Sequence, residues 1–498
     1  MAAMNLAAML DGHPDDAIAL VHHQRRYTYG ELRDIVGRTR ASILGLGLEP
    51  GDRVALVAGT TPRFVISYLA LLGAGMVVVP LNPLSPGPEL ARELAAVQPR
   101  ALVAGPMGAA AVALLSPDER SSVEFLIVPE GTDIDDGISL DDSTDPPVPL
   151  VDRSPDDLAV LMFTSGTAGS PKPAMLTHGC LSANLEQMEQ TNRVLRPSDV
   201  VLCPIPLFHI HGLNALVAPT FRAGATLVLM ERFDPSAAFD AVRDEGITVV
   251  SGPPALWASM AATPADGNPL TGVRMGLSGA ASLPPEIRST VEERFGFRIS
   301  EGYGLTESGS VLTVGDETTP AGSVGRPLPG VQLRLVDPEG DDVFVGDEGE
   351  VWAKGPNIFT GYWNDAEATG RALDTDGWLH TGDLAVVGDD GLLRLVDRAK
   401  DLVVVSGFNV YPAEVEEILR LHPAVADAGV IGVAHPHHGE AVRAYVVAAE
   451  GQTIEADDVI AHCQRHLAGY KCPATVSVVD AIPRTVTGKV RRRDLRSA

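Results

Sequence analysis

The chain has 498 residues, of which 45% are hydrophobic and 21% are charged, so it is globular rather than disordered and long enough for about three domains. It carries 65 acidic against 38 basic residues, a formal net charge of −27. This excess excludes general nucleic-acid binding and a basic membrane-surface role. Any anionic substrate must be met by a few locally placed cations, and the chain has only five lysines.

Cysteine usage and the N-terminal sequence both point to a reducing compartment. Cys180, Cys203, Cys463 and Cys472 form no C-x-x-C pair, and a chain of this length needs no disulfide. The start lacks the basic region of a secretory signal, and the apolar run 70–81 is about half the length that spans a bilayer. We therefore expect a cytoplasmic protein without an integral membrane segment.

Strand-like and helix-like runs alternate from early in the chain. The run 54–59 predicts a strand, Thr-Thr-Pro at 60–62 predicts the start of a helix to about Gly73, and the run 76–81 predicts a second strand. Such a βαβ unit implies a parallel sheet with a right-handed crossover. The Asp- and Pro-rich stretch 131–157 predicts an exposed connector. Further strands are expected at 101–105, 158–163, 225–230, 247–251, 331–336 and 349–353.

The last hundred residues predict a separate α+β module. A boundary at Asp397 divides the chain into an N-terminal domain, 1–396, and a C-terminal domain, 397–498. The fold class is α/β, with a large body of several subdomains, mixed and parallel sheets, and a small C-terminal domain. In the module, Pro412 opens a helix, strands are expected at 428–434, 444–449 and 474–480, and a second helix near 456–468.

The segment Thr164–Lys172 (TSGTAGSPK) has the composition of a phosphate-binding loop. A predicted strand leads into it. Its glycines let backbone N–H groups approach an anion, its hydroxyls add donors, and Lys172 adds charge. The spacing does not fit a Walker A loop. The alternative is a mobile glycine- and serine-rich surface turn.

Two further segments carry residues suited to nucleotide chemistry. In 302–307 (GYGLTE), Glu307 offers a hard-oxygen ligand for Mg²⁺ and Tyr303 an aromatic face for a purine. In 380–383 (HTGD), Asp383 is an ionised acceptor suited to ribose hydroxyls. Alone, 302–307 is equally compatible with a turn that carries a solvated glutamate, and 380–383 is more often an ordinary structural turn.

Together and in this order, the segments resemble those of the adenylate-forming superfamily of acyl-CoA synthetases, luciferases and peptide-synthetase adenylation domains. The resemblance includes a hinge segment from Asp397, its sequel 406–412, and the segment 483–489, and it spans roughly two-thirds of the chain. It is greatest to fatty acyl-CoA and aryl-CoA ligases. One position departs from the pattern: Pro173 stands where the family usually has glycine, and proline removes a backbone N–H.

The resemblance implies a role for each matched residue. Lys489, Glu307, Thr164 and His209 would be catalytic, with Glu307 also the Mg²⁺ ligand. ATP and AMP would be bound by Thr164, Ser165, Gly166, Thr167, Ala168, Gly169, Lys172, Gly279, Ala280, Ala281, Glu301, Gly302, Tyr303, Thr306, Asp383 and Arg398. The thiol would approach Ser406, Gly407 and Phe408, Asp397 would be the hinge, and Phe208, His209, Gly304 and Leu305 would line the acyl pocket.

The resemblance also implies two half-reactions that use ATP, Mg²⁺ and CoA. A carboxylate attacks the α-phosphate of ATP to give an acyl-adenylate and pyrophosphate, and a thiol then attacks the acyl carbon and releases AMP. Lys489 and a Mg²⁺ ion on Glu307 would neutralise charge in the first step. The ATP- and acyl-binding N-terminal domain would stay fixed, while the C-terminal domain, a mobile lid, rotates about Asp397.

The acid is expected to be fatty or otherwise hydrophobic, in keeping with fatty acid metabolism. No acidic residue lies between 200 and 230, where amino-acid-activating domains usually carry one. Open alternatives are an aryl- or dicarboxylate-CoA ligase, a ligase that loads a separate phosphopantetheinyl carrier protein, and an inactive nucleotide-binding homologue. A metal site at the pair His209 and His211 is disfavoured because no third ligand is apparent.

Overall fold

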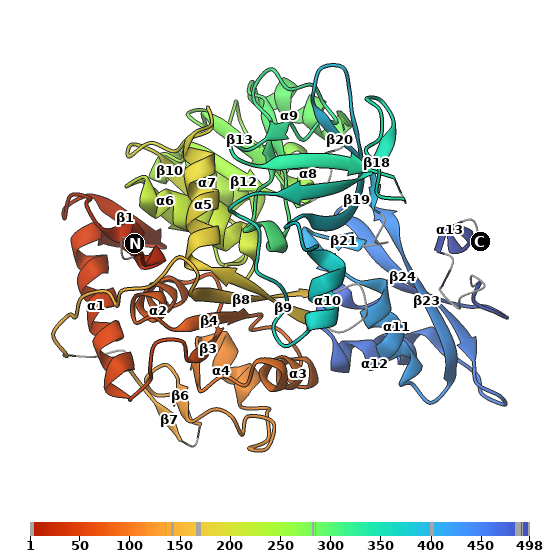
Figure 1. Cartoon of the computed structure of the whole chain (residues 1–498). Coiled ribbons are helices and arrows are strands. Elements are labelled where there is room, and N and C mark those ends of the chain that lie inside the picture. The colour runs from red at the N-terminus through yellow and green to blue at the C-terminus, as the bar shows by residue number, and fades with distance from the viewer. Residues whose placement is uncertain are drawn as a thin grey trace.

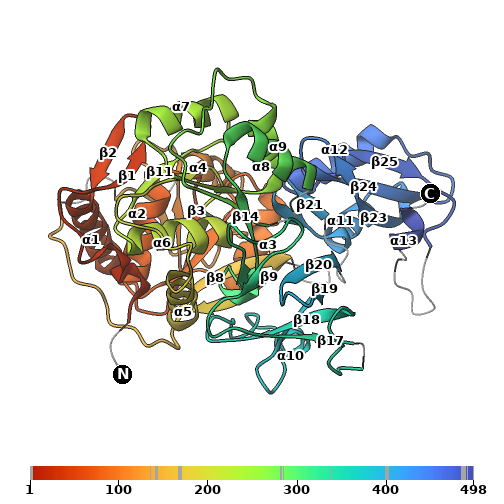
Figure 2. The same cartoon turned by 90° about the horizontal axis from the view of Figure 1, so that it is seen from above.

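The computed structural model describes residues 4–134, 136–140, 144–165, 171–280, 283, 285–337, 339–398, 403–483, 490 and 492–496 (Figure 1). It confirms the predicted fold class. A large α/β body holds the N-terminal two-thirds of the chain, and a smaller α+β module lies at one side of it (Figure 2).

Two large sheets form most of the body. The first has seven strands in the order β7-β6-β5-β3-β4-β8-β9, and the second has nine in the order β16-β15-β14-β13-β12-β10-β11-β1-β2. The strands of the first sheet are β3 (Arg53–Val57), β4 (Val77–Leu81), β5 (Ala101–Ala104), β6 (Phe125–Ile127), β7 (Gly137–Ile138), β8 (Leu158–Ser165) and β9 (Pro171–Thr177). Those of the second are β1 (Ile18–His22), β2 (Arg25–Thr28), β10 (Val200–Cys203), β11 (Thr226–Leu229), β12 (Val249–Gly252), β13 (Met275–Ser278), β14 (Ile299–Tyr303), β15 (Thr313–Val314) and β16 (Arg326–Pro327).

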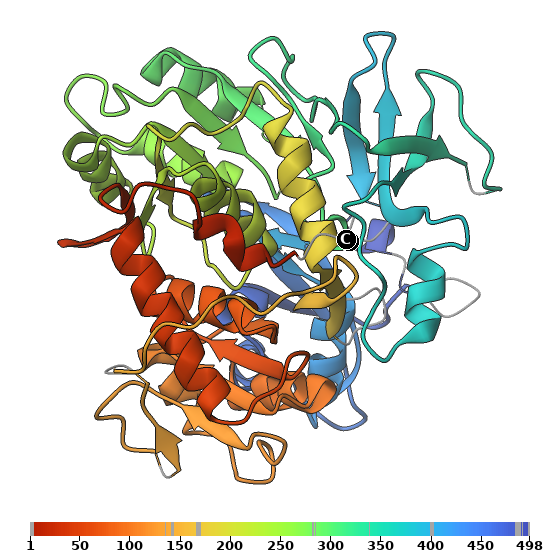
Figure 3. The ribbon, with the colours of Figure 1, turned by 60° about the vertical axis from the view of Figure 1, so that its left-hand side comes forward.

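Helices cover these sheets and lie between them. Figure 3 shows the red-to-orange N-terminal segments below the green segments of the second sheet, with the yellow helix α5 beside both. The helices of the body are α1 (Tyr29–Gly45), α2 (Pro62–Gly73), α3 (Gly87–Val97), α4 (Pro106–Val112), α5 (His178–Glu189), α6 (Ala218–Arg222), α7 (Pro235–Glu245), α8 (Pro254–Ala262), α9 (Pro285–Phe295) and α10 (Ala366–Ala372). Short 3₁₀ turns η1 (Leu6–Leu10) and η3 (Thr306–Ser308) and a π-helix, η2 (His211–Val217), complete the set.

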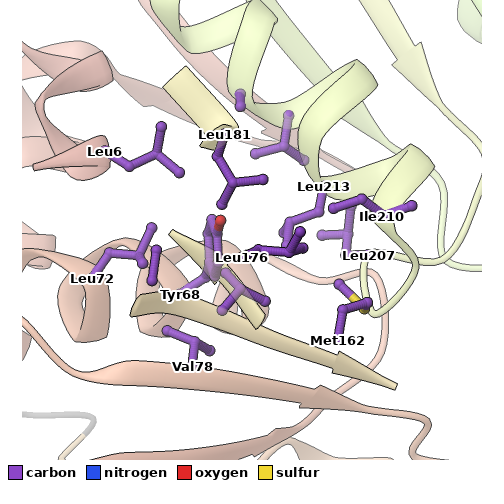
Figure 4. Packing of buried hydrophobic residues seen from close by; sticks show 14 of the residues in the cluster. Leu6, Tyr68, Leu72, Val78, Met162, Leu176, Leu181, Leu207, Ile210 and Leu213 are labelled. Carbon is purple, nitrogen blue, oxygen red and sulfur yellow. The ribbon is translucent and has the colours of Figure 1, made fainter. Parts of the chain in front are cut away.

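The predicted βαβ unit is β3-α2-β4, with β3 and β4 in parallel. Thr61 holds the N-cap position and Pro62 follows it as predicted, although the Thr61 side chain makes no capping hydrogen bond. Every residue of β4 is buried, because helices cover both faces of a parallel sheet. Figure 4 shows Tyr68 and Leu72 of α2 facing Leu181 of α5, so one aliphatic core joins the two sheets.

The expectation of a connector at 131–157 was wrong in one detail. Residues Gly137–Ile138 form the edge strand β7, which pairs in parallel with β6. Further along, the Val148 carbonyl accepts a hydrogen bond from Nε of the buried Arg40 at 3.0 Å. The described residues of the stretch are all exposed or half-buried, in keeping with a surface connector.

A small antiparallel sheet links the body to the C-terminal module. Its order is β17-β18-β19-β20, formed by β17 (Gln332–Val336), β18 (Glu348–Lys354), β19 (Leu379–Val387) and β20 (Leu393–Arg398). Asp397 lies within β20, where its backbone is in register with that of Leu384. The predicted domain boundary therefore coincides with the end of a paired strand rather than with a loop.

The C-terminal module contains the predicted elements in the predicted order. Its sheet has the order β22-β21-β24-β23, with β25 parallel to β24. As predicted, Pro412 opens a helix that buries Val415, Ile418 and Leu419. The elements are β21 (Val403–Val405), β22 (Phe408–Val410), α11 (Pro412–Arg420), β23 (Val425–His435), β24 (Gly439–Ala448), α12 (Ala456–His466), the 3₁₀ turn η4 (Gly469–Lys471), β25 (Thr475–Val478) and α13 (Arg492–Leu495).

The structure bears on what the sequence predicts for the cysteines and for membrane-spanning segments. All four cysteines are free thiols. Among the described residues, no helix combines the length and the hydropathy needed to cross a membrane.

His178, the first residue of α5, ties the N-terminus to the body. Its side chain is fully buried, and its Nδ1 accepts the backbone N–H of Leu6 at 3.1 Å. Burial, and secondarily the positive charge of Arg153, lower the pKa of His178 to about 4. The ring is therefore neutral near pH 7, as its acceptor role requires.

We expect His178 to make the fold acid-sensitive. The unfolded chain binds a proton at His178 near pH 6.5 and the folded chain only near pH 4, so the stabilisation is complete above about pH 6.5 and is lost as the pH falls towards 4. The loss is about 1.4 kcal/mol per pH unit in that window. Urea unfolding of the wild type and of His178→Gln at about pH 7 and about pH 5 measures it. Equal pH dependence in both proteins would contradict the assignment.

Candidate active site

A cavity of about 1040 Å³ brings most of the predicted site residues together. Its walls come from both large sheets of the body, from the antiparallel sheet and from the C-terminal module. The predicted residues that line it are Thr164, Phe208, His209, Gly279, Ala280, Gly302, Tyr303, Gly304, Leu305, Thr306, Glu307, Asp383, Gly407 and Phe408.

Other predicted residues lie elsewhere or are not described. Lys172, Glu301 and Ser406 are described but do not line the cavity. Outside the described residues lie Gly166, Thr167, Ala168, Gly169, Ala281 and Lys489, and the side chains of Ser165, Asp397 and Arg398 are likewise not described.

The position of the cavity follows from the sheet topology. Strands β12, β13 and β14 are parallel, and their carboxyl ends carry Ser251, Gly279 and Gly302 to the same edge of the sheet. This edge is where open α/β sheets bind ligands. Between β14 and η3 the chain passes so close to itself that only glycine fits at position 304, since a Cβ there would lie 1.9 Å from the Ser310 carbonyl oxygen.

Glu307 is held in place by two hydroxyl groups. Tyr362 donates its hydroxyl to Glu307 Oε1 at 2.6 Å, and Thr164 donates to the same oxygen at 3.4 Å. Burial and the charge of Glu307 raise the pKa of Tyr362, so its phenol remains a donor. Both hydroxyl groups donate to Oε1, so Oε2 takes no part in these two hydrogen bonds. The sequence did not identify Tyr362, since nothing in its local pattern marks a partner 55 residues away.

Tyr303 and Asp383 meet across two sheets. The Tyr303 hydroxyl donates to Asp383 Oδ2 at 2.8 Å, and both residues line the cavity. Asp383 on β19 is also in register with Arg398 on β20. The three residues predicted to contact adenosine thus lie close together. For Tyr303 and Asp383 the side chains are in contact, and for Arg398 the backbone pairs with that of Asp383.

Lys172 is engaged with a carboxylate. Its ammonium lies 2.8 Å from Asp365 Oδ2, and the interaction lowers the pKa of Asp365. Asp365 also accepts the backbone N–H of Ala368 and so caps α10. The adjacent Pro173 lies on the edge strand β9, where its carbonyl accepts the Trp363 N–H at 2.8 Å. Proline is tolerated there because an edge strand does not need every N–H.

Glu301 supports the loop that follows β13. Its carboxylate accepts the Leu283 N–H at 3.2 Å and lies 3.7 Å from Arg288. Burial raises the pKa of this carboxyl group, despite these contacts. Its contacts place Glu301 behind the cavity wall rather than in it.

The part of the cavity predicted to hold the acyl group contains two neutral histidines. Burial lowers the pKa of both His209 and His211 to about 4. His211 begins the π-helix η2, a helix type that is frequent at functional sites, and its Nε2 lies 3.2 Å from Ser251 Oγ. His211 and Ser251 were not predicted as site residues, although the H-x-H pattern drew attention to the first.

We also searched the surroundings of this histidine pair for further metal-ligating side chains. Within the described part of the chain, the group of three potential metal ligands is His22, His23 and Glu231, which lies at the surface. The pair His209 and His211 has no third ligand there.

A Cβ at Gly279 would lie 3.2 Å from His211 Cε1, so the ring packs closely against the cavity loop.

The C-terminal module contributes the opposite wall. The Phe408 ring lies 6.4 Å from the Phe208 ring and 6.5 Å from the His209 ring, and it stacks on Tyr470 at 4.4 Å. Gly407 has φ +85°, and a Cβ there would lie 3.0 Å from Pro253. Ser406 Oγ lies 2.8 Å from His438 Nδ1. Tyr470 is a further cavity residue that the sequence did not reveal.

Comparison with known proteins agrees with this arrangement. Residues 6–363 match the family described as AMP-binding enzyme, and residues 414–489 match the AMP-binding enzyme C-terminal domain. The chain belongs to this family. It lies in the acyl-CoA synthetase branch of the adenylate-forming superfamily and is an AMP-forming acid–thiol ligase.

Three similar proteins illustrate the relationship. A feruloyl-CoA synthase from an Amycolatopsis species is 38% identical over 96% of this chain and 95% of its own length. The 4-coumarate–CoA ligase 5 of Oryza sativa subsp. japonica is 34% identical over 99% and 91%. Among solved structures, an amide bond synthetase from Marinactinospora thermotolerans has a TM-score of 0.89 and 32% identity, with 99% of each chain covered.

Proposed function

We propose that the chain activates an aryl carboxylic acid with ATP to an acyl-adenylate and transfers the acyl group to CoA, with release of AMP and pyrophosphate. One observation carries the proposal. Residues suited to a nucleotide, a hydrophobic acyl wall and a loop of the C-terminal module share one cavity. Two reactions on one bound acyl group require such an arrangement.

On the nucleotide side, the residues present fit a Mg²⁺ ion. Glu307 offers a carboxylate oriented by Tyr362, and Thr164 adds a hydroxyl oxygen. A bound Mg²⁺ would supply charge neutralisation for the phosphates. The Tyr303 hydroxyl bond to Asp383 would hold the tyrosine ring flat against adenine, and Asp383 with Arg398 would bind the ribose.

The C-terminal module presents the loop with Gly407 and Phe408 to the cavity. The loop with Gly407 and Phe408 lies at the acyl side, whereas Val490 packs near Ile431 and Ile482 in a separate cluster. Figure 2 shows α13 on the side of the module away from the body. We infer that this orientation serves thiol attack and that rotation about Asp397 serves adenylation, with Lys489 as the adenylation cation.

The aryl class is favoured over a fatty acid by two observations. The relatives with 38% and 34% identity are named for feruloyl-CoA and 4-coumarate. In the cavity, the rings of Phe208, His209 and Phe408 lie together, and flat aromatic faces suit a planar aromatic acid. A fatty acid and a dicarboxylate remain the competing substrates.

An amine is a candidate for an additional acceptor beside the thiol. The likeness to an amide bond synthetase, at a TM-score of 0.89, favours it, because an acyl-adenylate reacts with an amine as with a thiol. A carrier-protein thiol is the third acceptor to test.

ATP–pyrophosphate exchange with the purified protein tests the proposal. Panels of aryl, fatty and dicarboxylic acids are compared, and CoA, an amine and a phosphopantetheinyl carrier are then offered as acceptors. We expect exchange to be fastest with aryl acids and the product to be the CoA thioester. Fastest exchange with a fatty acid would overturn the substrate class. Absence of exchange with every acid would favour the inactive nucleotide-binding alternative.

Glu307→Gln removes the carboxylate charge but keeps its shape. We expect adenylation to slow by about 10²- to 10³-fold and its Mg²⁺ dependence to weaken, because the metal loses an anionic ligand. Tyr362→Phe is the matched control, since it removes the hydroxyl that donates to Glu307 but keeps the carboxylate charge. A Mg²⁺ titration of pyrophosphate exchange is carried out on the wild type and on both variants. If Glu307→Gln titrates as the wild type does, the metal is held elsewhere.

Lys489→Ala separates the two half-reactions. A cation is needed when pyrophosphate leaves but not when a thiol attacks, so we expect adenylation to fall by about 10²- to 10³-fold. Thioester formation from a supplied acyl-adenylate should stay within about twofold of wild type, because the proposed rotation withdraws Lys489 from the site before the thiol attacks. Rapid-quench measurement of each step checks this, and an equal loss in both would refute the role.

A further inference from the structure

A buried ion cluster joins the C-terminal module to helix α3 of the body. The ammonium of Lys471 in η4 contacts a carboxylate oxygen of Glu89 on α3 and lies 3.0 Å from Glu414 Oε1 in α11. The second oxygen of Glu89 accepts the backbone N–H of Ala468 at 2.9 Å. Glu89 is 2% exposed, Glu414 3% and Lys471 6%. The body therefore supplies one carboxylate, and the module supplies the lysine and the other.

The charges in this cluster depend on one another. Burial and the nearby charge of Glu89 raise the pKa of Glu93, one turn along α3, to about 8, so that carboxyl is protonated near pH 7. One lysine then faces two buried carboxylates. Burial acts to lower the pKa of Lys471, but Tyr470 and the two carboxylates raise it well above its ordinary value. Removing one member of such a buried pair leaves an uncompensated charge and costs far more than the pair contributes.

The cluster is directly connected to the cavity. Tyr470 precedes Lys471 and stacks on Phe408 with ring centroids 4.4 Å apart and planes at 25°. Phe408 in turn lies against Phe208 and His209 on the acyl side. When Lys471 meets Glu89, Tyr470 and Phe408 are therefore fixed at the mouth of the acyl pocket.

We propose that Glu89 and Lys471 are positioning residues for thioester formation, because their buried ion pair holds the C-terminal module where Phe408 lies at the acyl pocket. The inference rests on the proposed function. The rotation proposed for adenylation separates the two residues and returns both charges to water. The pair therefore favours the thioester-forming orientation over the adenylating one.

Glu89 distinguishes this proposal from a purely structural role. The contact between Lys471 and Glu414 lies within the module and persists in every orientation of it. Glu89 meets Lys471 only when the module is docked on α3. Glu89→Gln therefore weakens docking and leaves the internal pair intact, whereas Lys471→Met removes both contacts.

Asp199 offers a matched control. It is a carboxylate with 2% exposure, like Glu89, and it pairs with Arg274 inside the body. Asp199→Asn is therefore the same chemical change in an ion pair that does not cross to the module. It should lower stability without changing the ratio of the two half-reactions.

The experiment measures pyrophosphate exchange and single-turnover transfer from a supplied acyl-adenylate to CoA. It uses the full-length wild type, the single variants Glu89→Gln, Lys471→Met, Lys471→Arg and Asp199→Asn, and the double variant of Glu89→Gln with Lys471→Met. Transfer should fall by about tenfold or more in Glu89→Gln and Lys471→Met, while exchange stays within about twofold. The double variant should lose little more than the worse single one, because the two residues act as one pair. Lys471→Arg, which keeps the charge, should lose less than Lys471→Met.

Amide hydrogen exchange at Ala468 gives a readout without catalysis, because its N–H donates to Glu89. We expect faster exchange there in Glu89→Gln and unchanged exchange in β23 and β24. Equal loss of both half-reactions, unchanged transfer, or unchanged protection of Ala468 would overturn the positioning role. The wild type could perform neither half-reaction while amide exchange at Ala468 is still faster in Glu89→Gln. That outcome would refute the proposed function but not the docking pair.

Discussion

The proposed reaction brings a carboxylate and a polyphosphate together inside a chain whose net charge is −27. The site therefore depends on a small number of positive charges placed close to it. Of the described lysines, Lys172 is paired with Asp365, and Lys471 is paired with Glu89 and Glu414. Lys354 lies 5.8 Å from the ring of Trp378. In the part of the chain that the structure describes, each lysine thus has a protein partner.

The sequence could not show that Lys172 pairs with Asp365. A lysine at the end of a glycine-rich loop predicts a phosphate contact, but the sequence does not show which carboxylate will come close. Asp365 lies almost two hundred residues further on and caps α10, so only the packed fold reveals it. The pairs Glu307–Tyr362 and Glu89–Lys471 escaped prediction for the same reason. Long-range polar contacts have no local periodicity to indicate them.

The elements that the sequence did predict share one physical cause. Strands such as β4 and β5 are buried on both faces and so appear as short continuous apolar runs. Helix α11 has its buried residues at helical spacing after a proline. Where the cause is a neighbouring strand instead, prediction fails. Gly137 and Ile138 form β7 because β6 offers an unpaired edge, and the surrounding Asp and Pro residues indicate only a connector. Likewise, Asp397 belongs to a strand because β19 pairs with it.

A buried ion pair suits an interface that must open and close during a catalytic cycle. An apolar contact of the same area would lose its full burial energy on opening, because apolar surface gains nothing from water. An ion pair behaves differently, since the rehydration of both charges offsets most of the lost attraction. Its net contribution is small, but its geometry is strict, because a misplaced partner leaves a charge buried and unpaired. Glu89 and Lys471 would thus select one docking position for Tyr470 and Phe408 without making that position difficult to leave.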